Sequence, residues 1–188
     1  MEAKEILLIR HGRPKSATNE KVNATGFAHW VRDYNRAQLH PKSKAGHRLD
    51  LSEYYIMSSD LKRAQLSASQ YSDQPIHEIS ALLREMDIPR YRLPFRLRAW
   101  TWVVINRAIW FAGVRGPFES FSAAKVRANY AANLLEARAE THRKVVVFGH
   151  GLSNRYIRRN LERRGWKVLS KDHGYWGLNR LQLPVSTD

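Results

Sequence analysis

The sequence predicts an α/β fold of three layers, with a mostly parallel central sheet and helices on both of its faces. Short aliphatic runs at residues 6–9 and 145–148 are typical of buried strands because they are apolar throughout and partly β-branched. Segments with helical apolar spacing separate such runs, and strands that alternate with helices indicate a parallel sheet. No repeat, low-complexity tract or Gly/Ser linker divides the chain, so we expect one domain over residues 1–188.

In the first half of the chain, apolar spacing and capping residues predict each element. A polar loop follows the first strand, and the next helix has an apolar stripe of Phe27, Trp30, Val31 and Tyr34. Residues 40–50 carry no periodic pattern and are expected to be irregular. The expected elements are a strand at 6–9, a helix from an N-cap at Thr25 through Leu39, a strand at 54–57, and a helix capped by Ser59 or Asp60 that ends near Tyr71.

The second half begins with an irregular stretch, because Pro89 and Pro94 restrict the residues before them. Helical patterns then flank the clearest later strand. The expected elements are a helix at 95–112, a helix opened by Ser120 or Ser122 and ending at Ala139, a strand at 145–148, a helix from Ser153 to about Arg164, and a final strand at 178–183.

The chain is strongly basic, with 32 lysines and arginines against 17 aspartates and glutamates and a net charge of +15. This balance bears on partners and solubility rather than on the fold. A phosphorylated anionic substrate, a nucleic acid or an anionic lipid would each be attracted. Much of the excess lies at 84–107, where arginines alternate with aromatic residues, and at 155–167.

The chain contains no cysteine, which excludes disulfides and thiolate metal sites. The first strand begins almost at the N-terminus and leaves no room for a signal peptide, so a cytoplasmic protein is expected. The histidines outside the strand ends show no metal-ligand spacing, and no Gly-Lys-Ser/Thr phosphate loop is present. Neither a metal nor another cofactor is therefore expected.

Charged side chains follow three of the expected strands and would meet at one edge of a parallel sheet. Arg10 and His11 end the first strand, Arg63 opens the helix after the second, and His150 follows the strand at 145–148. In open α/β sheets, ligands bind just beyond the carboxyl ends of the strands. Guanidinium groups match phosphate oxygens, and helix N-termini add N–H donors, so this cluster predicts an oxyanion site.

With these residues in place, the chain resembles the histidine phosphatase superfamily, also called the phosphoglycerate-mutase-like or RHG family. Any single matching motif is weakly specific, but the ordered set spans nearly the whole chain and is specific. The resemblance implies a phosphoglycerate-mutase-like fold and a phosphatase-type activity. The matching pieces are residues 8–12 (Leu-Ile-Arg-His-Gly), 58–64 (Ser-Ser-Asp-Leu-Lys-Arg-Ala), 83–85 (Leu-Arg-Glu), 119–120 (Glu-Ser) and 149–151 (Gly-His-Gly).

The resemblance also implies a role for each of these side chains. His11 would be the nucleophile that forms a phosphohistidine, and Arg10, Arg63 and His150 would hold the phosphate. Glu85 matches the general acid that protonates the leaving oxygen and then activates water. For that role, Asp87 is the nearby competitor and His77 and Glu78 are more distant ones. Alternatively, Glu85 is only a surface ion-pair partner of Arg84 or Arg90.

Two positions depart from the family pattern. An asparagine that contacts phosphate in the family would fall at Ala17, so Ser16 or Asn19 are the candidates to replace it. The pair at 119–120 follows Phe118 where the family usually has glycine. We therefore expect that pair to cap a helix rather than to serve the site.

The segment at 95–112 is unusually apolar, although Arg96, Arg98 and Arg107 interrupt it. It is too short and too charged to span a bilayer. Ordinary packing is one interpretation. Another is a lid or specificity segment at about 89–118, and a minor alternative is a peripheral membrane contact.

Three functions compete on these grounds. The leading one is a metal-independent phosphatase that hydrolyses phosphate monoesters through His11, with Glu85 as the general acid and base. The enzymatic alternative is a phosphoglycerate-mutase-like phosphotransfer enzyme. The third is a non-catalytic protein that binds phosphate or nucleic acid in the same basic pocket.

Overall fold

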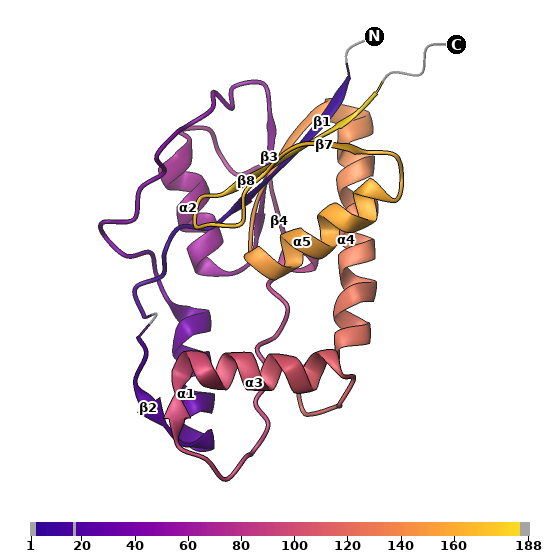
Figure 1. The fold of residues 1–188 in the computed structure, drawn as a ribbon. Helices are drawn as coiled ribbons and strands as arrows, with labels where there is room; N and C mark the ends of the chain where they lie inside the picture. The colour runs from indigo at the N-terminus through magenta and orange to yellow at the C-terminus, as the bar shows by residue number, and fades with distance from the viewer. Residues whose placement is uncertain (1–2, 17, 185–188) are drawn as a thin grey trace.

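A six-stranded mixed sheet forms the centre of the protein, and the computed structural model describes residues 3–16 and 18–184. The strands are β1 (Lys4–Arg10), β3 (Tyr55–Ser59), β4 (Glu78–Ser80), β6 (Lys144–Gly149), β7 (Lys167–Lys171) and β8 (Leu178–Leu183). Their order is β4-β3-β6-β1-β8-β7 (Figure 1). The first four in this order are parallel, whereas β8 and β7 are antiparallel additions. The predicted three-layer α/β class is confirmed.

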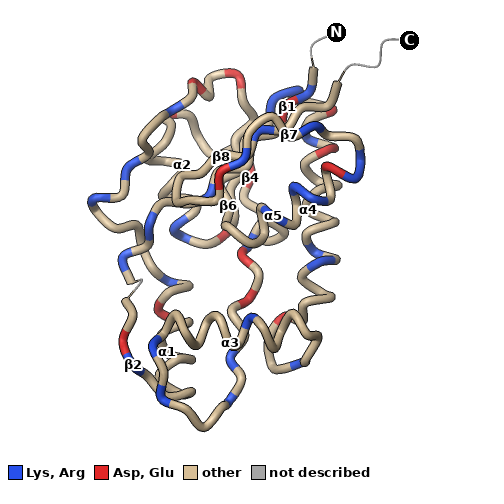
Figure 2. Tube along the Cα trace, in the orientation of Figure 1, with Lys and Arg blue, Asp and Glu red and all other residues tan. Residues whose placement is uncertain are grey.

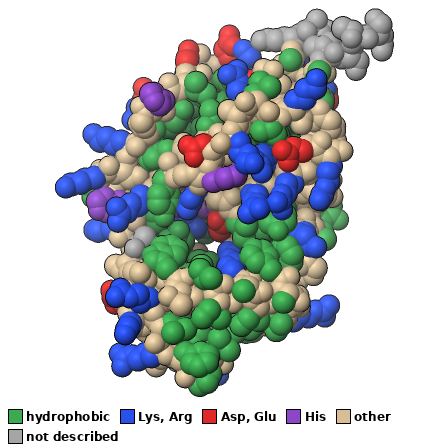
Figure 3. All heavy atoms as spheres, in the orientation of Figure 1, with side chains coloured by type: hydrophobic (Ala, Val, Ile, Leu, Met, Phe, Trp, Pro, Cys, Tyr) green, Lys and Arg blue, Asp and Glu red, His purple; other side chains and the backbone are tan. Residues whose placement is uncertain are grey.

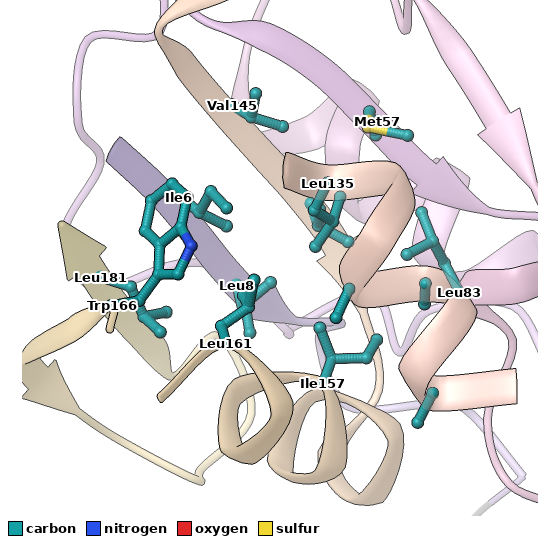
Figure 4. Packing of buried hydrophobic residues seen from close by; sticks show 14 of the residues in the cluster. Ile6, Leu8, Met57, Leu83, Leu135, Val145, Ile157, Leu161, Trp166 and Leu181 are labelled. Atoms are coloured by element: carbon teal, nitrogen blue, oxygen red, sulfur yellow. The ribbon is translucent and has the colours of Figure 1, made fainter. Parts of the chain in front are cut away.

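Helices cover both faces of this sheet, as the alternating pattern predicted. On one face, α4 (Phe121–His142) and α5 (Gly151–Glu162) pack on Ile6 and Leu8 of β1 (Figure 4). On the other face, α2 (Lys62–Tyr71) packs on Leu7 of β1 and its neighbours. Because alternate β1 side chains enter the two clusters, this strand is buried on both faces, which explains its continuous aliphatic sequence.

A third apolar cluster lies outside the central sheet. It joins α1 (Ala24–Arg36) to α3 (Ala99–Phe111), with Phe27 stacked on Trp102 at a ring distance of 5.5 Å. A two-stranded sheet of β2 (Lys21–Val22) and β5 (Leu97–Arg98) closes its end. Figure 1 shows this unit below the carboxyl ends of the parallel strands, where it forms a wall beside the predicted site.

The helix ends differ from those predicted. Asn23, not Thr25, caps α1 by accepting from the Gly26 N–H, and the helix ends at Arg36 instead of Leu39 because Ala37 is extended. Neither Ser59 nor Asp60 is the N-cap of α2, which is Leu61 without a side-chain bond.

Two later helices also differ in their bounds. The helix expected from Ser153 starts at Gly151, and the one expected at 95–112 is shorter because β5 precedes it. Ser120 caps α4 as one of the two predicted candidates, since its side chain accepts from the Ala123 N–H.

The sequence did not predict four short or edge strands. β2 and β5 have two residues each, and β4 has three, which is too short for a period-2 pattern. β7 is mostly exposed and lies at the sheet edge, so it lacks the apolar content of the central strands. A 3-10 turn, η1 (Ala81–Leu83), leads from β4 to Glu85.

Candidate active site

The fold brings the four predicted phosphate-site residues together. Arg10 ends β1 and His11 follows it, Arg63 lies in the first turn of α2 after β3, and His150 is the N-cap of α5 after β6. These three strands are adjacent in the sheet. The rings of His11 and His150 lie 5.0 Å apart, and Arg63 contacts His11 directly.

The contacts of His11 fix the position of its ring proton. Nδ1 lies 2.7 Å from the carbonyl oxygen of Gly12, which can only accept. Nε2 lies 3.2 Å from Nε of Arg63, which can only donate. Neutral His11 therefore carries its proton on Nδ1 and keeps a lone pair on Nε2.

The surroundings also keep both histidines uncharged. Burial, followed by the positive charge of Arg63, lowers the pKa of His11 from 6.5 to about 3. Burial is again the first cause at His150, where the pKa lies well below 6.5. Both imidazoles are therefore neutral at physiological pH, which is the nucleophilic form.

Arg10 is held by the loop between β7 and β8. Its Nη1 donates to the carbonyl oxygen of His173 at 2.8 Å, and its guanidinium carbon lies 4.2 Å from the ring centre of Tyr175. The main chain of Arg10 is held as well, because its N–H donates to Gly177 and its carbonyl accepts from Trp176. The same loop therefore fixes both the backbone and the side chain of Arg10.

Arg63 is anchored at the C-terminal end of α1. Its Nη1 donates to the carbonyl oxygens of Tyr34 at 3.1 Å and Asn35 at 3.3 Å, which belong to the last turn of that helix. The last carbonyls of a helix have no partners within it and carry partial negative charge, so a guanidinium is favoured there. The Tyr34 ring adds a contact, with its centre 5.0 Å from the guanidinium carbon.

Three of the four predicted residues keep a buried nitrogen without a hydrogen-bond partner in the described protein. These atoms are Nε of Arg10, Nη2 of Arg63 and Nδ1 of His150. The other ring nitrogen of His150 lies 2.8 Å from the Ser59 hydroxyl. Buried polar groups normally have partners, so these nitrogens indicate a site for an anion.

Glu85 and Asp87 occupy different positions. Oε1 of Glu85 accepts from the N–H of Ser153 at 3.0 Å, and Oε2 lies 3.5 Å from the Leu152 N–H, so this carboxylate lies at the N-terminus of α5. Asp87 instead accepts from the Glu119 N–H at 3.2 Å. Only Glu85 of the two lines the cavity beside Arg10.

The two more distant candidates for the general acid have structural partners. Glu78 forms an ion pair with Arg138 at 2.6 Å, and His77 accepts from the Ile56 N–H at 2.9 Å. The alternative role of Glu85, an ion pair with Arg84 or Arg90, is not found among the described residues, where Arg84 pairs with Asp60.

A cavity of about 390 Å³ adjoins the cluster at Arg10, and its lining mixes apolar with basic groups. Its wall combines aromatic and aliphatic side chains with arginines and Glu85. It is lined by Arg10, Tyr34, Glu85, Ile88, Trp100, Val103, Arg107, Gly151, Leu152, Arg155 and His173. A second cavity of about 470 Å³ shares Glu85 but not Arg10.

Four described residues at or near the departures from the family pattern do not line this cavity, namely Ser16, Asn19, Glu119 and Ser120. Ala17 lies outside the described residues. Ser16 donates to the carbonyl of Asp33, and Asn19 accepts from the Trp100 N–H, so both side chains have structural partners. Glu119 forms an ion pair with Arg127 at 2.7 Å next to the capping Ser120.

Several site residues could not be found from the sequence. Tyr34, Arg107 and Tyr175 contact the cluster or line the cavity from a helix end, a helix and a loop. No strand-end pattern marks them. Within the described part of the chain, no group of three or more His, Asp or Glu side chains is placed to hold a metal ion.

Comparisons with known proteins agree with this architecture. The family model for the histidine phosphatase superfamily (branch 1) matches residues 6–182. Among solved structures, a phosphoserine phosphatase mutant from Entamoeba histolytica with bound phosphoserine has a TM-score of 0.56 and 16% identity, covering 94% of this chain and 89% of that one.

Two mycobacterial structures are also similar. Glucosyl-3-phosphoglycerate phosphatase Rv2419c has a TM-score of 0.54 and 19% identity, with 85% of this chain and 80% of that chain covered. The product of the open reading frame Rv3214 of Mycobacterium tuberculosis has a TM-score of 0.55 and 18% identity, with 82% and 77% covered. Because these sequence identities are low, the structural similarity shows the fold alone. No curated protein matches the chain.

Proposed function

Because this chain belongs to branch 1 of the histidine phosphatase superfamily, we propose that it is a phosphatase that hydrolyses phosphate monoesters through a phosphohistidine on His11. The observation that supports this most directly is the Nε2 lone pair of His11, which faces Arg63 among buried nitrogens without partners. A nucleophile and donors for phosphate oxygens are thus held at one point.

In the first step, Nε2 of His11 gives up its hydrogen bond from Arg63 and attacks phosphorus, and the bond from phosphorus to the ester oxygen breaks. The leaving oxygen takes a proton from the carboxyl group of Glu85. Positive charge develops on the His11 ring, and the carbonyl of Gly12, which accepts from Nδ1–H at 2.7 Å, stabilises it. Arg10 and Arg63 neutralise the charge on the phosphoryl oxygens, and neutral His150 donates a hydrogen bond from Nδ1, so the proposed chemistry is metal-independent.

In the second step, the Glu85 carboxylate takes a proton from water, and the water oxygen attacks the phosphorus of phosphohistidine. The bond from phosphorus to Nε2 breaks, which releases inorganic phosphate and restores neutral His11. The N-terminus of α5 holds Glu85 for this step, because the Ser153 N–H donates to its Oε1 at 3.0 Å.

The test is a phosphatase screen over sugar phosphates, nucleotides, phosphoproteins, lipid phosphates and p-nitrophenyl phosphate. We expect wild type to release inorganic phosphate and His11→Ala to lose this activity. His47→Ala serves as the matched control because that histidine is exposed and outside the site.

Three outcomes would contradict the proposal. Full activity in a folded His11→Ala variant would show that His11 is not the nucleophile. Salt-sensitive binding of an oligonucleotide without hydrolysis of any substrate would favour a binding protein. Transfer of phosphate to a second hydroxyl of the substrate, instead of to water, would identify a mutase.

A further inference from the structure

The outer face of α3 is an exposed apolar surface. Val104 is 68% exposed and Phe111 is 43% exposed, and Phe95 and Val114 beyond the two ends of the helix are 53% and 49% exposed. Figure 3 shows hydrophobic side chains gathered at the lower end of the molecule, over α3. We name the residues Phe95, Thr101, Val104, Ala108, Phe111 and Val114 the α3 face. A contiguous exposed apolar area of this kind marks an interaction site.

No charged side chain interrupts the α3 face. Arg107 is the only charged residue of α3, and it turns toward the cavity. Its Nη2 donates to the carbonyl of Met86 at 2.8 Å, and its guanidinium carbon lies 4.8 Å from the Trp110 ring centre. The exposed residues Thr101, Val104 and Ala108 therefore form a row without charge.

Arginines flank α3 on both sides in the sequence, and acidic residues are absent from this segment. Between Asp87 and Glu119 the sequence contains no aspartate or glutamate. Figure 2 shows the arginines as blue segments along this part of the tube. Those with exposed side chains are Arg92, Arg96, Arg98 and Arg115, and no ion pair within the described residues engages them. The exposed acids of the unit that α3 forms with α1 are Glu20, beside β2, and Asp33, in α1; neither belongs to the α3 segment.

We propose that the α3 face docks on an anionic lipid bilayer, with its apolar side chains in the interface and the four arginines on lipid headgroups. An apolar face rimmed by arginine is the pattern of a helix that lies in the plane of a membrane surface. A second copy of the chain fits less well, because a symmetric contact would bring the two arginine rims together. The helix cannot cross the bilayer, since no helix in residues 3–16 and 18–184 is long and apolar enough.

The α3 face adjoins the candidate active site on the same helix. Three residues of α3 line the cavity, namely Trp100, Val103 and Arg107. The residue that follows each of them in the sequence belongs to the α3 face. A bound bilayer would thus lie beside the cavity, whose wall also includes Ile88 and Leu152. This arrangement fits one class of substrate, a phosphate monoester of a membrane amphiphile. That inference rests on the proposed phosphatase activity.

The docking is tested by sedimentation of the full chain with vesicles. We expect binding to phosphatidylcholine vesicles that contain about 30% phosphatidylglycerol, weaker binding to pure phosphatidylcholine, and a loss of affinity from about 0.1 M to about 0.5 M NaCl. Val104→Glu should weaken binding by about tenfold or more, because it places a charge where an apolar side chain enters the interface. Arg96→Gln should weaken it by about fivefold.

Leu169→Glu provides the matched control. Leu169 is 54% exposed on β7, which Figure 1 places at the opposite end of the molecule from α3. This variant should bind vesicles as wild type does. Equal losses in Val104→Glu and Leu169→Glu would overturn the proposal, as would a wild-type dimer that Val104→Glu dissociates without any vesicle binding.

The activity measurement separates the docking from the phosphatase proposal. We expect Val104→Glu to keep wild-type activity on soluble p-nitrophenyl phosphate and to lose most hydrolysis of phosphatidic acid in vesicles. Equal rates of Val104→Glu and wild type on the vesicle substrate would overturn the substrate class. His11→Ala should still bind vesicles, so vesicle binding without hydrolysis of any substrate would refute the phosphatase and leave the docking standing.

Discussion

Nε of Arg63 lies 3.2 Å from Nε2 of His11, and this contact places the His11 lone pair on the side of the buried cluster. Because arginine cannot accept a hydrogen bond, the same contact excludes a proton on Nε2 in the neutral ring. Arg63 is itself fixed by the last carbonyls of α1. A helix from another part of the chain thus sets the ring state of the proposed nucleophile.

Arg63→Lys should lower kcat by about 10²- to 10³-fold. The guanidinium fork of arginine has enough donors to bond His11, the α1 carbonyls and phosphate. The single ammonium of lysine cannot make all of these hydrogen bonds. Steady-state kinetics with p-nitrophenyl phosphate measure the effect. Arg92→Lys, an exposed arginine, is the control and should stay at the wild-type rate. Unchanged kcat in Arg63→Lys would show that the fork is dispensable.

Acid should destabilise the protein through His11. The folded-state pKa of His11 is about 3, below its ordinary 6.5. Between these values the unfolded chain binds a proton that the folded chain does not, so the free energy of unfolding falls as pH falls through this window. Above 6.5 the contribution vanishes.

Urea unfolding of wild type and His11→Gln, at about pH 7.5 and about pH 5, measures this linkage. From the pKa of His11, wild type should lose about 2 kcal/mol more than the variant between these conditions. The same pH-dependent loss in both proteins would show that His11 is not the titrating group.

Glu85→Gln should lower kcat by about 10²- to 10⁴-fold on an alkyl phosphate, because the leaving alkoxide needs a proton. The loss on p-nitrophenyl phosphate should be smaller, since p-nitrophenolate leaves without protonation. Asp87→Asn is the control, because Asp87 is bonded to the Glu119 N–H and does not line the cavity beside Arg10. If Asp87→Asn instead showed the dependence on the leaving group, the acid would be Asp87.

Tyr175→Ala should reduce kcat/KM by a factor between about 2 and 30, the range expected for loss of a cation–π contact. The ring of Tyr175 lies over the Arg10 guanidinium and 5.9 Å from the ring of His11. Tyr175→Phe keeps the ring face and should retain activity. If Phe and Ala lower kcat/KM equally, the hydroxyl and not the ring face is the group that matters.

The strand-end residues could be predicted from the sequence because their positions follow from local patterns. A buried strand is recognisable from its own residues, and parallel strands deliver their ends to one edge. The structure therefore brings the four predicted strand-end residues together, as expected: Arg10, His11, Arg63 and His150. Their catalytic roles stay predictions until the variants are measured.

The remaining contacts could not be predicted because they join distant segments. The start of α5 is stabilised by Glu85, 68 positions before Ser153, so no capping signal near Gly151 announces it. Tyr175 reaches the site only because β8 pairs with β1 in antiparallel register. Ala17 lies outside the described residues, so its place in the site stays a prediction.

The position of β1 in the sheet has a consequence for synthesis on the ribosome. β1 is made first, yet both of its neighbours, β6 and β8, come from residues 144–183. The apolar segment of β1 therefore stays unpaired until these later strands have been translated. Non-local strand pairing of this kind is slow, and the unpaired segment is prone to aggregate. Any nascent chain that stops before β8 lacks the strand that pairs with β1, so the sheet beside the Arg10 loop closes only after β8 is made.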